Sequence, residues 1–386
     1  MPKKVCVMTS VHPPFDVRIF HKECRSLARA GYHVTLIAPI DADQVVEVIR
    51  IRAFPKFRSR LRRFVAGAFF MYRMAKREQA DVYHFHDPEL IPTALLLRAS
   101  GSVVVYDIHE DVPKTISYKA YIPKWLRNPV QLAVKVVEEF ASRMMSGIIA
   151  ATTPIADRFS AVRCKAVVHN YPLLREFAAP SDRSERATGN YIAYVGARVT
   201  HGRGATEMVQ AMGLLPPTVD TRLKIAGAFD PPQLPERLSG LSGWERIEML
   251  GMLGRAEVSE MLRGARAGLV LLHPEPNYLN AQPVKLFEYM GAGIPVIASD
   301  FPVWRNVIET AGCGLLVNPL DPEAIACAIE HLWTHPAEAL EMGRRGRAAV
   351  EARYNWDREE EKLLQFYGGL TGSEPETVSS QVEARA

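Results

Sequence analysis

Cysteine is scarce in this sequence and follows no pattern. Five cysteines are scattered along 386 residues, and none belongs to a Cys-x-x-Cys pair. Neither a disulfide framework nor a zinc ribbon is therefore supported. Reduced thiols in a cytosolic protein are the simplest interpretation of Cys6, Cys24, Cys164, Cys313 and Cys327.

Long apolar segments are also missing. No segment reaches the ~20 apolar residues of a membrane span. The first apolar run stops at Met8, before Pro13 and Pro14, and is too short for a signal peptide. We therefore expect a cytoplasmic protein that does not cross a membrane, although it can still touch one from the cytoplasmic face.

Neither sign of charge dominates. The chain has 47 Lys and Arg against 43 Asp and Glu, a formal net charge of +4 and a pI near 8.7. This balance does not indicate nucleic-acid binding. The hydrophobic fraction of 48% is typical of a globular protein. The length exceeds the ~100–150 residues of a usual domain and predicts two cores.

Short β-branched runs alternate with helical patterns, which indicates βαβ units, a parallel sheet and an α/β fold. Residues 16–31 carry apolar side chains at helical spacing and end at Gly31, so we expect a crossover helix there. The strands expected in this half are Lys4–Thr9, His33–Ala38, Val46–Ile51, Asp81–His86, Val103–Asp107, Gly147–Ala151 and Lys165–His169.

A second set of strands follows a polar linker at residues 171–190. The sequence thus predicts two doubly wound, Rossmann-like domains at residues 1–170 and 191–368, the last helix being able to pack back on the first domain, and a disordered tail at 369–386. Such domains bind ligands at the carboxyl ends of their strands, which predicts an inter-domain cleft. The expected strands are Tyr191–Gly196, Arg222–Gly227, Arg246–Leu250, Gly268–His273, Ile294–Ser299 and Gly314–Val317.

A glycine-rich loop with two arginines follows the strand at residues 191–196. The loop runs from Gly196 to Gly204, contains Arg198 and Arg203, and leads into a helical pattern. Glycines let the backbone approach a phosphate, while guanidinium groups and a helix N-terminus attract it. The alternative is a turn that needs glycine only for its conformation.

A second polar cluster lies at residues 273–300. Pro283 is placed to open a helix through Met290 that Gly291 or Gly293 ends. We expect free N–H groups and side chains at this helix start to bind an anion together with Lys285, and Glu288 to bind vicinal hydroxyls. The alternative is a solvated Lys285–Glu288 pair, although the apolar residues around it favour burial. The residues at the helix start are Asn280, Ala281 and Gln282.

Three segments resemble one enzyme family. They are VHPPFDVRIFHKECRSLARAGYHVTLIAP near the start, DVYHFHDPEL with VVYDIHEDVPK in the middle, and NYLNAQPVKLFEYMGAGIPVIASDFPVWR near the end. Because of these segments, the chain resembles GT-B-fold glycosyltransferases of the family-4 type, in their bacterial polysaccharide branch. The resemblance extends to about residue 368. The resemblance implies a retaining transfer of a sugar from a nucleotide diphosphate-sugar.

The resemblance also implies roles on the donor side. Arg198 or Arg203, with Gly196 and Gly204 beside them, resemble the basic pair that holds the donor diphosphate. Glu288 resembles the second glutamate of the family's E-x7-E element, which binds the ribose. The first glutamate of that element is Asn280 here, which can hydrogen-bond a sugar but carries no charge.

On the acceptor side, His109 follows a strand where the family keeps a histidine beside the transferred sugar. Asp16 and Arg18 lie in a loop that frames the acceptor, although Asp16 could simply cap a helix. His84 and His86 share one face of their strand; we favour the core for His84 and the acceptor side for His86. We expect no metal site in the chain, since the histidines have no third ligand at a suitable spacing and the resemblance implies a metal-independent enzyme.

The implied reaction needs no cofactor and no protein nucleophile. Arg198, Arg203 and Lys285 would neutralise the leaving phosphate, with His109 beside the sugar. Two alternatives remain open. One is a nucleotide-sugar 2-epimerase that uses Glu110 and Asp111 as acid and base; the other is a non-catalytic nucleotide-sugar-binding subunit.

A basic and apolar segment suggests where the acceptor lies. Residues 50–77 hold ten basic residues and no acidic one, interleaved with aromatic residues. We expect an interfacial helix on an anionic membrane and a lipid-linked glycan acceptor. A second basic stretch at residues 114–135 lies in the same domain. The alternative is a core helix with a solvated basic rim.

Overall fold

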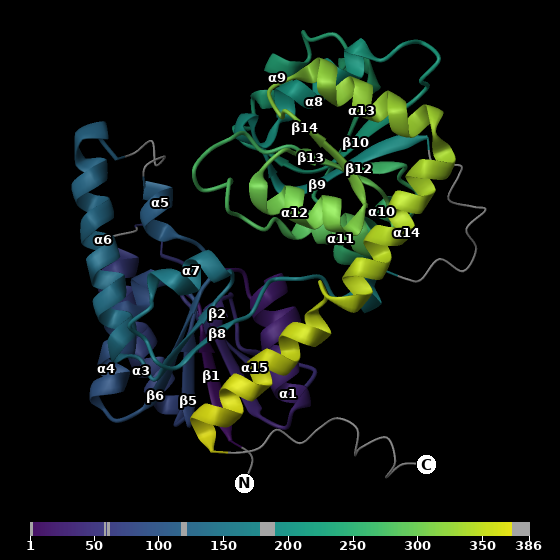
Figure 1. The fold of residues 1–386 in the computed structure, drawn as a ribbon. Helices are drawn as coiled ribbons and strands as arrows, with labels where there is room; N and C mark the ends of the chain where they lie inside the picture. Colours follow the sequence, from purple (N-terminus) through teal and green to yellow (C-terminus); the bar gives the residue numbers. More distant parts are fainter. Residues whose placement is uncertain (1–2, 58, 60–61, 117–121, 178–189, 373–386) are drawn as a thin grey trace, which may run out of the picture. The chain divides into compact units, whose positions relative to one another are not determined.

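The computed structural model describes residues 3–57, 59, 62–116, 122–177 and 190–372. Contacts divide the chain into two compact units (Figure 1). The first unit contains Met1–Asn170 and Asp357–Ala386, and the second contains Tyr171–Trp356. Each unit is built on its own mainly parallel sheet, which confirms the α/β class with two doubly wound domains.

The first unit contains an eight-stranded sheet in the order β3-β4-β2-β1-β5-β6-β7-β8. Neighbouring strands are parallel except β3, which runs antiparallel to β4. The central strands are buried along almost their whole length, as a parallel sheet covered on both faces requires. The strands are β1 (Lys4–Met8), β2 (His33–Pro39), β3 (Gln44–Val46), β4 (Ile49–Phe54), β5 (Val82–Phe85), β6 (Val103–Ile108), β7 (Gly147–Ala150) and β8 (Lys165–Val167).

Helices of the first unit connect successive strands, and α3, α4 and α6 pack side by side. The expected crossover helix at residues 16–31 is confirmed: Asp16 caps it through the N–H groups of Arg18 and Ile19, and Gly31 follows its end at a φ of 86°. The helices are η1 (Val17–Cys24), α1 (Arg25–Arg29), η2 (Arg63–Gly67), α3 (Ala68–Glu78), η3 (Pro88–Leu90), α4 (Ile91–Ala99), α5 (Val112–Ile116), α6 (Lys124–Met144), α7 (Thr153–Arg158) and α15 (Trp356–Thr371).

One predicted strand is wrong. The expected strand at Val46–Ile51 is a hairpin in which β3 pairs antiparallel with β4. Glu47 turns the chain with a φ of 57°, a conformation that the sequence does not mark with glycine or proline. Because β4 continues to Phe54, the first residues of the basic segment 50–77 lie in a strand and not in an interfacial helix.

The second unit contains a six-stranded sheet in the order β11-β10-β9-β12-β13-β14, with all neighbours parallel. Its strands are β9 (Tyr191–Val199), β10 (Arg222–Phe229), β11 (Ile247–Gly251), β12 (Ala267–Val270), β13 (Val296–Ser299) and β14 (Gly314–Val317). Its helices are η4 (Leu174–Glu176), η6 (His201–Arg203), α8 (Ala205–Leu214), α9 (Leu234–Leu238), η7 (Trp244–Arg246), α10 (Arg255–Arg263), α11 (Val284–Ala292), α12 (Pro302–Ala311), α13 (Pro322–Thr334) and α14 (Pro336–Ala352).

Apolar side chains from both faces of the second sheet form two clusters. One cluster lies under α8 and α13 and includes Met208 and Ile329. The other lies under α10, α11 and α12 and includes Phe287 and Trp304. A sheet covered on both faces leaves only its strand ends open to a ligand, so the loops at the carboxyl ends of the strands are where a site is expected.

The predicted boundaries differ from the structure at two places. The start of the expected linker is packed: Tyr171, Leu173 and Phe177 are buried, and η4 lies between them. The expected tail begins too early, because α15 continues to Thr371 and its residues from Asp357 onward belong to the first unit. The rest of the linker and tail, at 178–189 and 373–386, lies outside the described residues.

Candidate functional site

The glycine-rich loop of the second unit is tightly packed. Gly204 adopts a φ of 76°, and a Cβ there would lie 2.7 Å from the carbonyl oxygen of Leu271. A Cβ at Gly227 would lie 1.9 Å from the carbonyl oxygen of Gly196. These positions need glycine because the loop turns sharply against β10 and β12 before α8 begins. The glycines thus have a structural role, and what the loop binds depends on the side chains around it.

Lys285 places a buried ammonium group beside this loop. Its side chain comes from the first turn of α11, and Nζ lies 3.8 Å from the ring centroid of Tyr194. Nζ also lies 3.0 Å from the position that a Cβ on Gly196 would take. Only 9% of Lys285 is exposed, and Nζ has no hydrogen-bond partner among the described residues. Burial, and then the charge of Arg203, lower the pKa of Lys285 well below its usual value.

Arg203 and Arg198 differ in their surroundings. The charge and hydrogen bond of Arg203 act on the Tyr194 hydroxyl, whose pKa burial nevertheless raises to about 12. Within the described part of the chain, no carboxylate forms an ion pair with Arg203 or Lys285. Arg198 is 70% exposed and pairs with Asp230 at 3.2 Å. The two cations without a carboxylate partner, Arg203 and Lys285, therefore form an electropositive site, the basic cradle, at the loop.

Glu288 is held by an arginine that the sequence analysis missed. One oxygen of Glu288 accepts a hydrogen bond from Arg255 at 2.9 Å, and Arg255 also contacts the carboxylate of Glu176. Burial lowers the pKa of Arg255, but Glu288 and Glu176 raise it above its ordinary value overall. Glu288 is only 6% exposed, so the predicted burial is confirmed, and the simple solvated pair with Lys285 is wrong.

The segment before α11 differs from the prediction. The helix begins at Val284, and Gly293 ends it with a φ of 72°. Ala281 has no free N–H group, because it donates to the carbonyl of Tyr278 at 3.1 Å. Asn280 is exposed, whereas the side-chain oxygen of Gln282 is buried without a hydrogen-bond partner among the described residues. Of the three predicted residues at the helix start, Gln282 thus has the unsatisfied polar atom.

In the first unit, Arg18 organises a buried ion network. Its guanidinium donates two hydrogen bonds to Asp107, each of 2.9 Å, and one to the carbonyl of Val168 at 2.8 Å. The carboxylate of Glu23 lies 2.8 Å from Arg18 Nε. Arg18 is only 2% exposed, so the predicted direct contact with an acceptor does not agree with the structure. Its role is to position Asp107.

The two carboxyl groups of this network differ in charge. Burial raises the pKa of both, but Arg18 reverses the effect at Asp107 and holds its pKa well below the usual value. At Glu23, burial and the charge of Asp107 raise the pKa well above its usual value. These pKa directions favour the ionised form of Asp107 beside Arg18 and the protonated form of Glu23.

Asp107 in turn positions His109. Nε2 of His109 lies 3.0 Å from Oδ2 of Asp107 and 2.8 Å from Nδ1 of His86. The His109 side chain is 17% exposed, whereas His86 is buried, and burial lowers the pKa of His86 to about 4. The predicted core position of His84 is confirmed, since it is buried and lies 2.7 Å from the Tyr367 hydroxyl. His109 is thus the member of this network that reaches the surface.

A loop beside His109 is fixed by a further buried carboxylate. Asp87 accepts hydrogen bonds from Thr9 at 2.8 Å and from the N–H of Ser10 at 2.6 Å. His12 lies between Asp87 and Asp16, with nitrogen–oxygen distances of 3.3 and 3.7 Å. Although burial raises the pKa of Asp16, the hydrogen bonds from His12 and Ile19 lower it overall. Asp16 therefore caps the helix, as the simpler interpretation predicted, and also holds His12.

An epimerase-type acid–base pair is not supported at the positions that the sequence suggested. Asp111 is held by Arg158 at 2.7 Å and by Lys114 at 3.1 Å. Both contacts give this carboxylate ion-pair partners within its own unit. The structure gives no reason to assign Asp111 an acid–base role.

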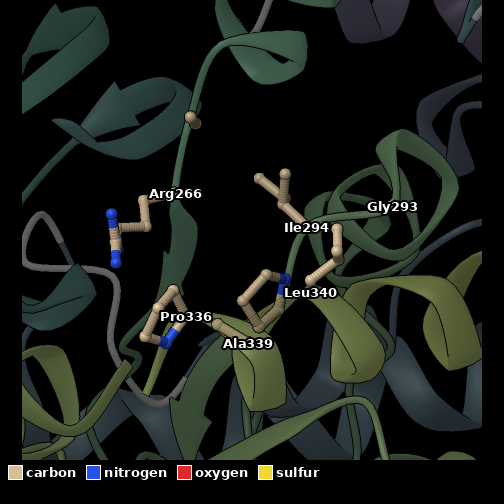
Figure 2. Close-up of a pocket in the computed structure, with 8 residues that line it drawn as sticks. Arg266, Gly293, Ile294, Pro336, Ala339 and Leu340 are labelled. Carbon is tan, nitrogen blue, oxygen red and sulfur yellow. The ribbon is translucent and has the colours of Figure 1, made fainter. Parts of the chain in front are cut away.

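The hollow shown in Figure 2 lies away from these groups. Residues before β12 and β13 line it together with α14, so it opens at the amino ends of the strands. Arg266 is its charged side chain, and the guanidinium already donates to the carbonyls of Leu332 and Trp333. Ligands of doubly wound folds bind at the opposite ends of the strands. This hollow is therefore not the candidate site.

The residues missed by sequence reasoning are those whose partners lie far away along the chain. Arg255 is 33 positions from Glu288, and Asp107 is 89 from Arg18. A signal existed for Asp107, which lies two positions before His109 at the end of a strand. Arg255 carried the same signal as Arg18, a guanidinium at a helix start, but this signal does not identify the partner.

Two doubly wound units, one with a glycine-rich basic cradle, define the GT-B class of glycosyltransferases. Family comparisons agree: Glycosyltransferase Family 4 matches residues 17–170, and Glycosyl transferases group 1 matches residues 189–335. The chain belongs to this glycosyltransferase family and is a glycosyltransferase, which confirms the resemblance and the enzyme class.

Similar proteins include enzymes with different substrates. Phosphatidyl-myo-inositol mannosyltransferase of Mycobacterium leprae is 24% identical over 327 residues, which are 83% of this chain and 79% of that protein. Sucrose-phosphate synthase of Thermosynechococcus elongatus has a TM-score of 0.77 at 19% identity, covering 96% of this chain and 99% of that one. HepE of Anabaena, solved with UDP and glucose, has a TM-score of 0.72 at 13% identity, with coverages of 95% and 100%. The solved structures show the shared fold.

Among the described residues, every helix is too short or too polar to cross a membrane.

Proposed function

We propose that this glycosyltransferase transfers a sugar, with retention of configuration, from a nucleoside diphosphate-sugar to a hydroxyl of a glycan acceptor. The observation that carries the donor class is Lys285, a buried ammonium group with no hydrogen-bond partner among the described residues and with Arg203 beside it. Two uncompensated cations at a glycine-rich loop favour an anion of at least two charges. HepE, a protein of the same fold, was solved with UDP, which supports a diphosphate at this loop.

Glu288 would bind the ribose of the donor. Arg255 fixes one of its oxygens, and the carboxylate stands four residues before the end of α11 on the helix that also carries Lys285. A carboxylate held in one orientation accepts hydrogen bonds from two vicinal hydroxyls without losing further side-chain entropy. Base, ribose and diphosphate would thus be bound by the second unit.

The chemistry needs no protein nucleophile in this proposal. The leaving diphosphate takes the proton of the incoming hydroxyl while the new bond forms on the same face of the sugar. The basic cradle, Arg203 with Lys285, stabilises the negative charge that develops on the leaving phosphate, and one preorganised donor of this kind contributes about 3 kcal/mol. His109, held by Asp107, would hydrogen-bond the sugar or the acceptor from the first unit.

The acceptor is proposed to be lipid-linked, since the first unit exposes an apolar surface with basic residues. Helix α6 exposes 78% of Trp125 and 61% of Phe140, and α3 exposes 58% of Phe69. Lys124 and Arg143 are exposed near the two ends of α6. The Mycobacterium leprae relative is named for a lipid acceptor, which supports the same class here. Phe69 agrees with the predicted interfacial segment, but Met71 from that segment lies in the core.

Vesicle sedimentation tests the membrane contact. Binding is expected to need anionic lipid, to fall as salt rises, and to fall in Trp125→Ser with Phe140→Ser and in Lys124→Ser with Arg143→Ser. Leu320→Ser, an exposed apolar position of the second unit, is the control. Equal binding to neutral vesicles, or no binding at all, contradicts the proposal. Arg58, Arg60, Tyr118 and Tyr121, predicted to take part, lie outside the described residues.

Product analysis tests the reaction itself. The enzyme, a panel of UDP- and GDP-sugars and a membrane extract should give nucleoside diphosphate and a heavier acceptor by mass spectrometry, with the anomeric configuration retained by NMR. Lys285→Met should lose this product, whereas Lys224→Met should keep it. Lys224 also lies over a tyrosine ring, at 4.4 Å, but has Glu248 as its partner. Conversion of the nucleotide-sugar without release of nucleotide would indicate an epimerase. Binding of donors without any product across the panel would indicate a non-catalytic binding subunit.

A further inference from the structure

Three metal-ligand side chains of the second unit converge from positions far apart in the sequence. They are His201 in η6, Glu207 in the first turn of α8, and His273 after β12. One potential ligand atom from each residue lies within 4.8 Å of the others. The other such group among the described residues surrounds Glu23 and Asp107, and there Arg18 already supplies the positive charge.

The fold holds these three residues in place. The left-handed turn at Gly204 starts α8 directly after His201–Arg203, which brings Glu207 back over His201. The N–H of His273 donates to the carbonyl of Gly202 at 3.0 Å, so the segment after β12 is tied to the same turn. The ring of His201 is oriented by a hydrogen bond of 3.0 Å between Nδ1 and Thr206 Oγ1. This contact is the kind that orients a metal-binding histidine.

The cluster leaves buried polar atoms unsatisfied. Glu207 is only 8% exposed, and its Oε2 has no hydrogen-bond partner among the described residues. Nε2 of His273 is also buried without a hydrogen bond, although it lies 3.1 Å from Glu207 Oε1. Buried polar atoms of this kind are rare in native proteins unless a water or an ion satisfies them. A His273–Glu207 ion pair alone would leave Oε2 without a partner.

We propose that His201, Glu207 and His273 bind one zinc-class transition metal ion. Two imidazoles and one carboxylate are a donor set that suits Zn²⁺, with a fourth position open to water or a ligand. Ca²⁺ and Mg²⁺ prefer oxygen ligands and are disfavoured by two imidazoles. The ion would link the η6 turn to the segment after β12. The sequence predicted no metal site because His84, His86 and His109 lack a third ligand at a suitable spacing. The group of His201, Glu207 and His273 has no such local spacing and was missed.

Cobalt binding tests the site directly. Untagged protein is titrated with Co²⁺, whose visible absorption reports tetrahedral coordination, and the bound Co²⁺ is then displaced with Zn²⁺. The expected result is one ion per chain. His201→Gln, His273→Gln and Glu207→Gln should each weaken binding about tenfold or more. His33→Gln, at an exposed histidine of the first unit, should leave binding unchanged.

A second histidine pair serves as the background control. His331 and His335 are four positions apart in the sequence, and their rings stack at the C-terminal end of α13. They can bind metal weakly at the surface. The proposal is overturned if Co²⁺ gives no tetrahedral spectrum, or if the signal disappears in His331→Gln with His335→Gln but persists in the three site variants. Circular dichroism checks that each variant is folded. Because the titration uses the metal alone, its result does not depend on whether a nucleoside diphosphate is the donor.

Discussion

The buried ammonium group of Lys285 has opposite consequences for stability and for donor binding, and Lys285→Met separates them. In the free protein, burial lowers the pKa of Lys285 well below its usual value, which is the sign of an unfavourable environment for its charge. Methionine has a similar length and no charge. We therefore expect the variant to unfold at the same temperature as the wild type or higher, because the cost of burying the charge is removed.

Donor binding should weaken in the same variant. Loss of one charge-assisted hydrogen bond to a phosphate costs about 1.5–3 kcal/mol, which is an increase of roughly 10- to 150-fold in the dissociation constant. Coulomb attraction between unit charges 4 Å apart at an effective dielectric of 20 is about 4 kcal/mol and sets the upper bound. Calorimetry with UDP and GDP measures the change, and Lys224→Met should bind as the wild type does.

The pKa of Lys285 also sets the pH dependence of binding. Burial, and then Arg203, disfavour the ammonium form and lower the pKa in the free protein, whereas a bound diphosphate favours that form and raises the pKa. Above the pKa of the free protein, binding therefore takes up a proton, and donor affinity falls as pH rises. Calorimetry in buffers of different ionisation enthalpy should detect this uptake in the wild type only. Wild-type affinity in Lys285→Met, or equal proton uptake in both proteins, would refute the assignment of Lys285 to the diphosphate.

Three further predictions concern charged residues of the two units. Arg203→Ala should lower turnover about 10²-fold, whereas Arg198→Ala, at a residue that is 70% exposed, should lower it much less; equal turnover in both variants would show that the loop is only a turn. Glu288→Gln should weaken donor binding by about 1.5–3 kcal/mol in calorimetry while its circular dichroism stays unchanged, and unchanged affinity would exclude the ribose role. In urea unfolding, Asp107→Asn should lose about 3–5 kcal/mol because it removes the carboxylate partner of a buried cation, whereas Glu23→Gln should lose less because burial and Asp107 favour the protonated form of Glu23; equal losses would contradict this difference.

The sequence predicted the fold well wherever one local signal was enough. The strands were recognisable because β-branched runs end at polar or glycine-containing segments, and the parallel strands other than β4 were found within a few residues of their bounds. The hairpin β3–β4 was missed because its turn at Glu47 and Val48 has no glycine, proline or asparagine. Local composition therefore fails where a turn uses a strained conformation of an ordinary residue.

The candidate site could be predicted only in part, for a related reason. Lys285 and Glu288 were predictable because helical spacing places them on one helix. Their surroundings were not, because Arg255 and Tyr194 reach them through the order of the strands in the sheet.

The role of Arg18 could also be predicted only in part, because its partner is brought near by the order of the strands. A guanidinium at a helix start opposes the helix dipole, so the sequence indicated that some other interaction keeps it there. That interaction is with Asp107, whose strand β6 is separated from β1 by β5 in the sheet. The need for a partner was therefore visible in one segment, but the identity of the partner required the sheet order. Since Asp107 also contacts His109, the arginine acts on this partly buried histidine through the carboxylate and not by reaching the acceptor.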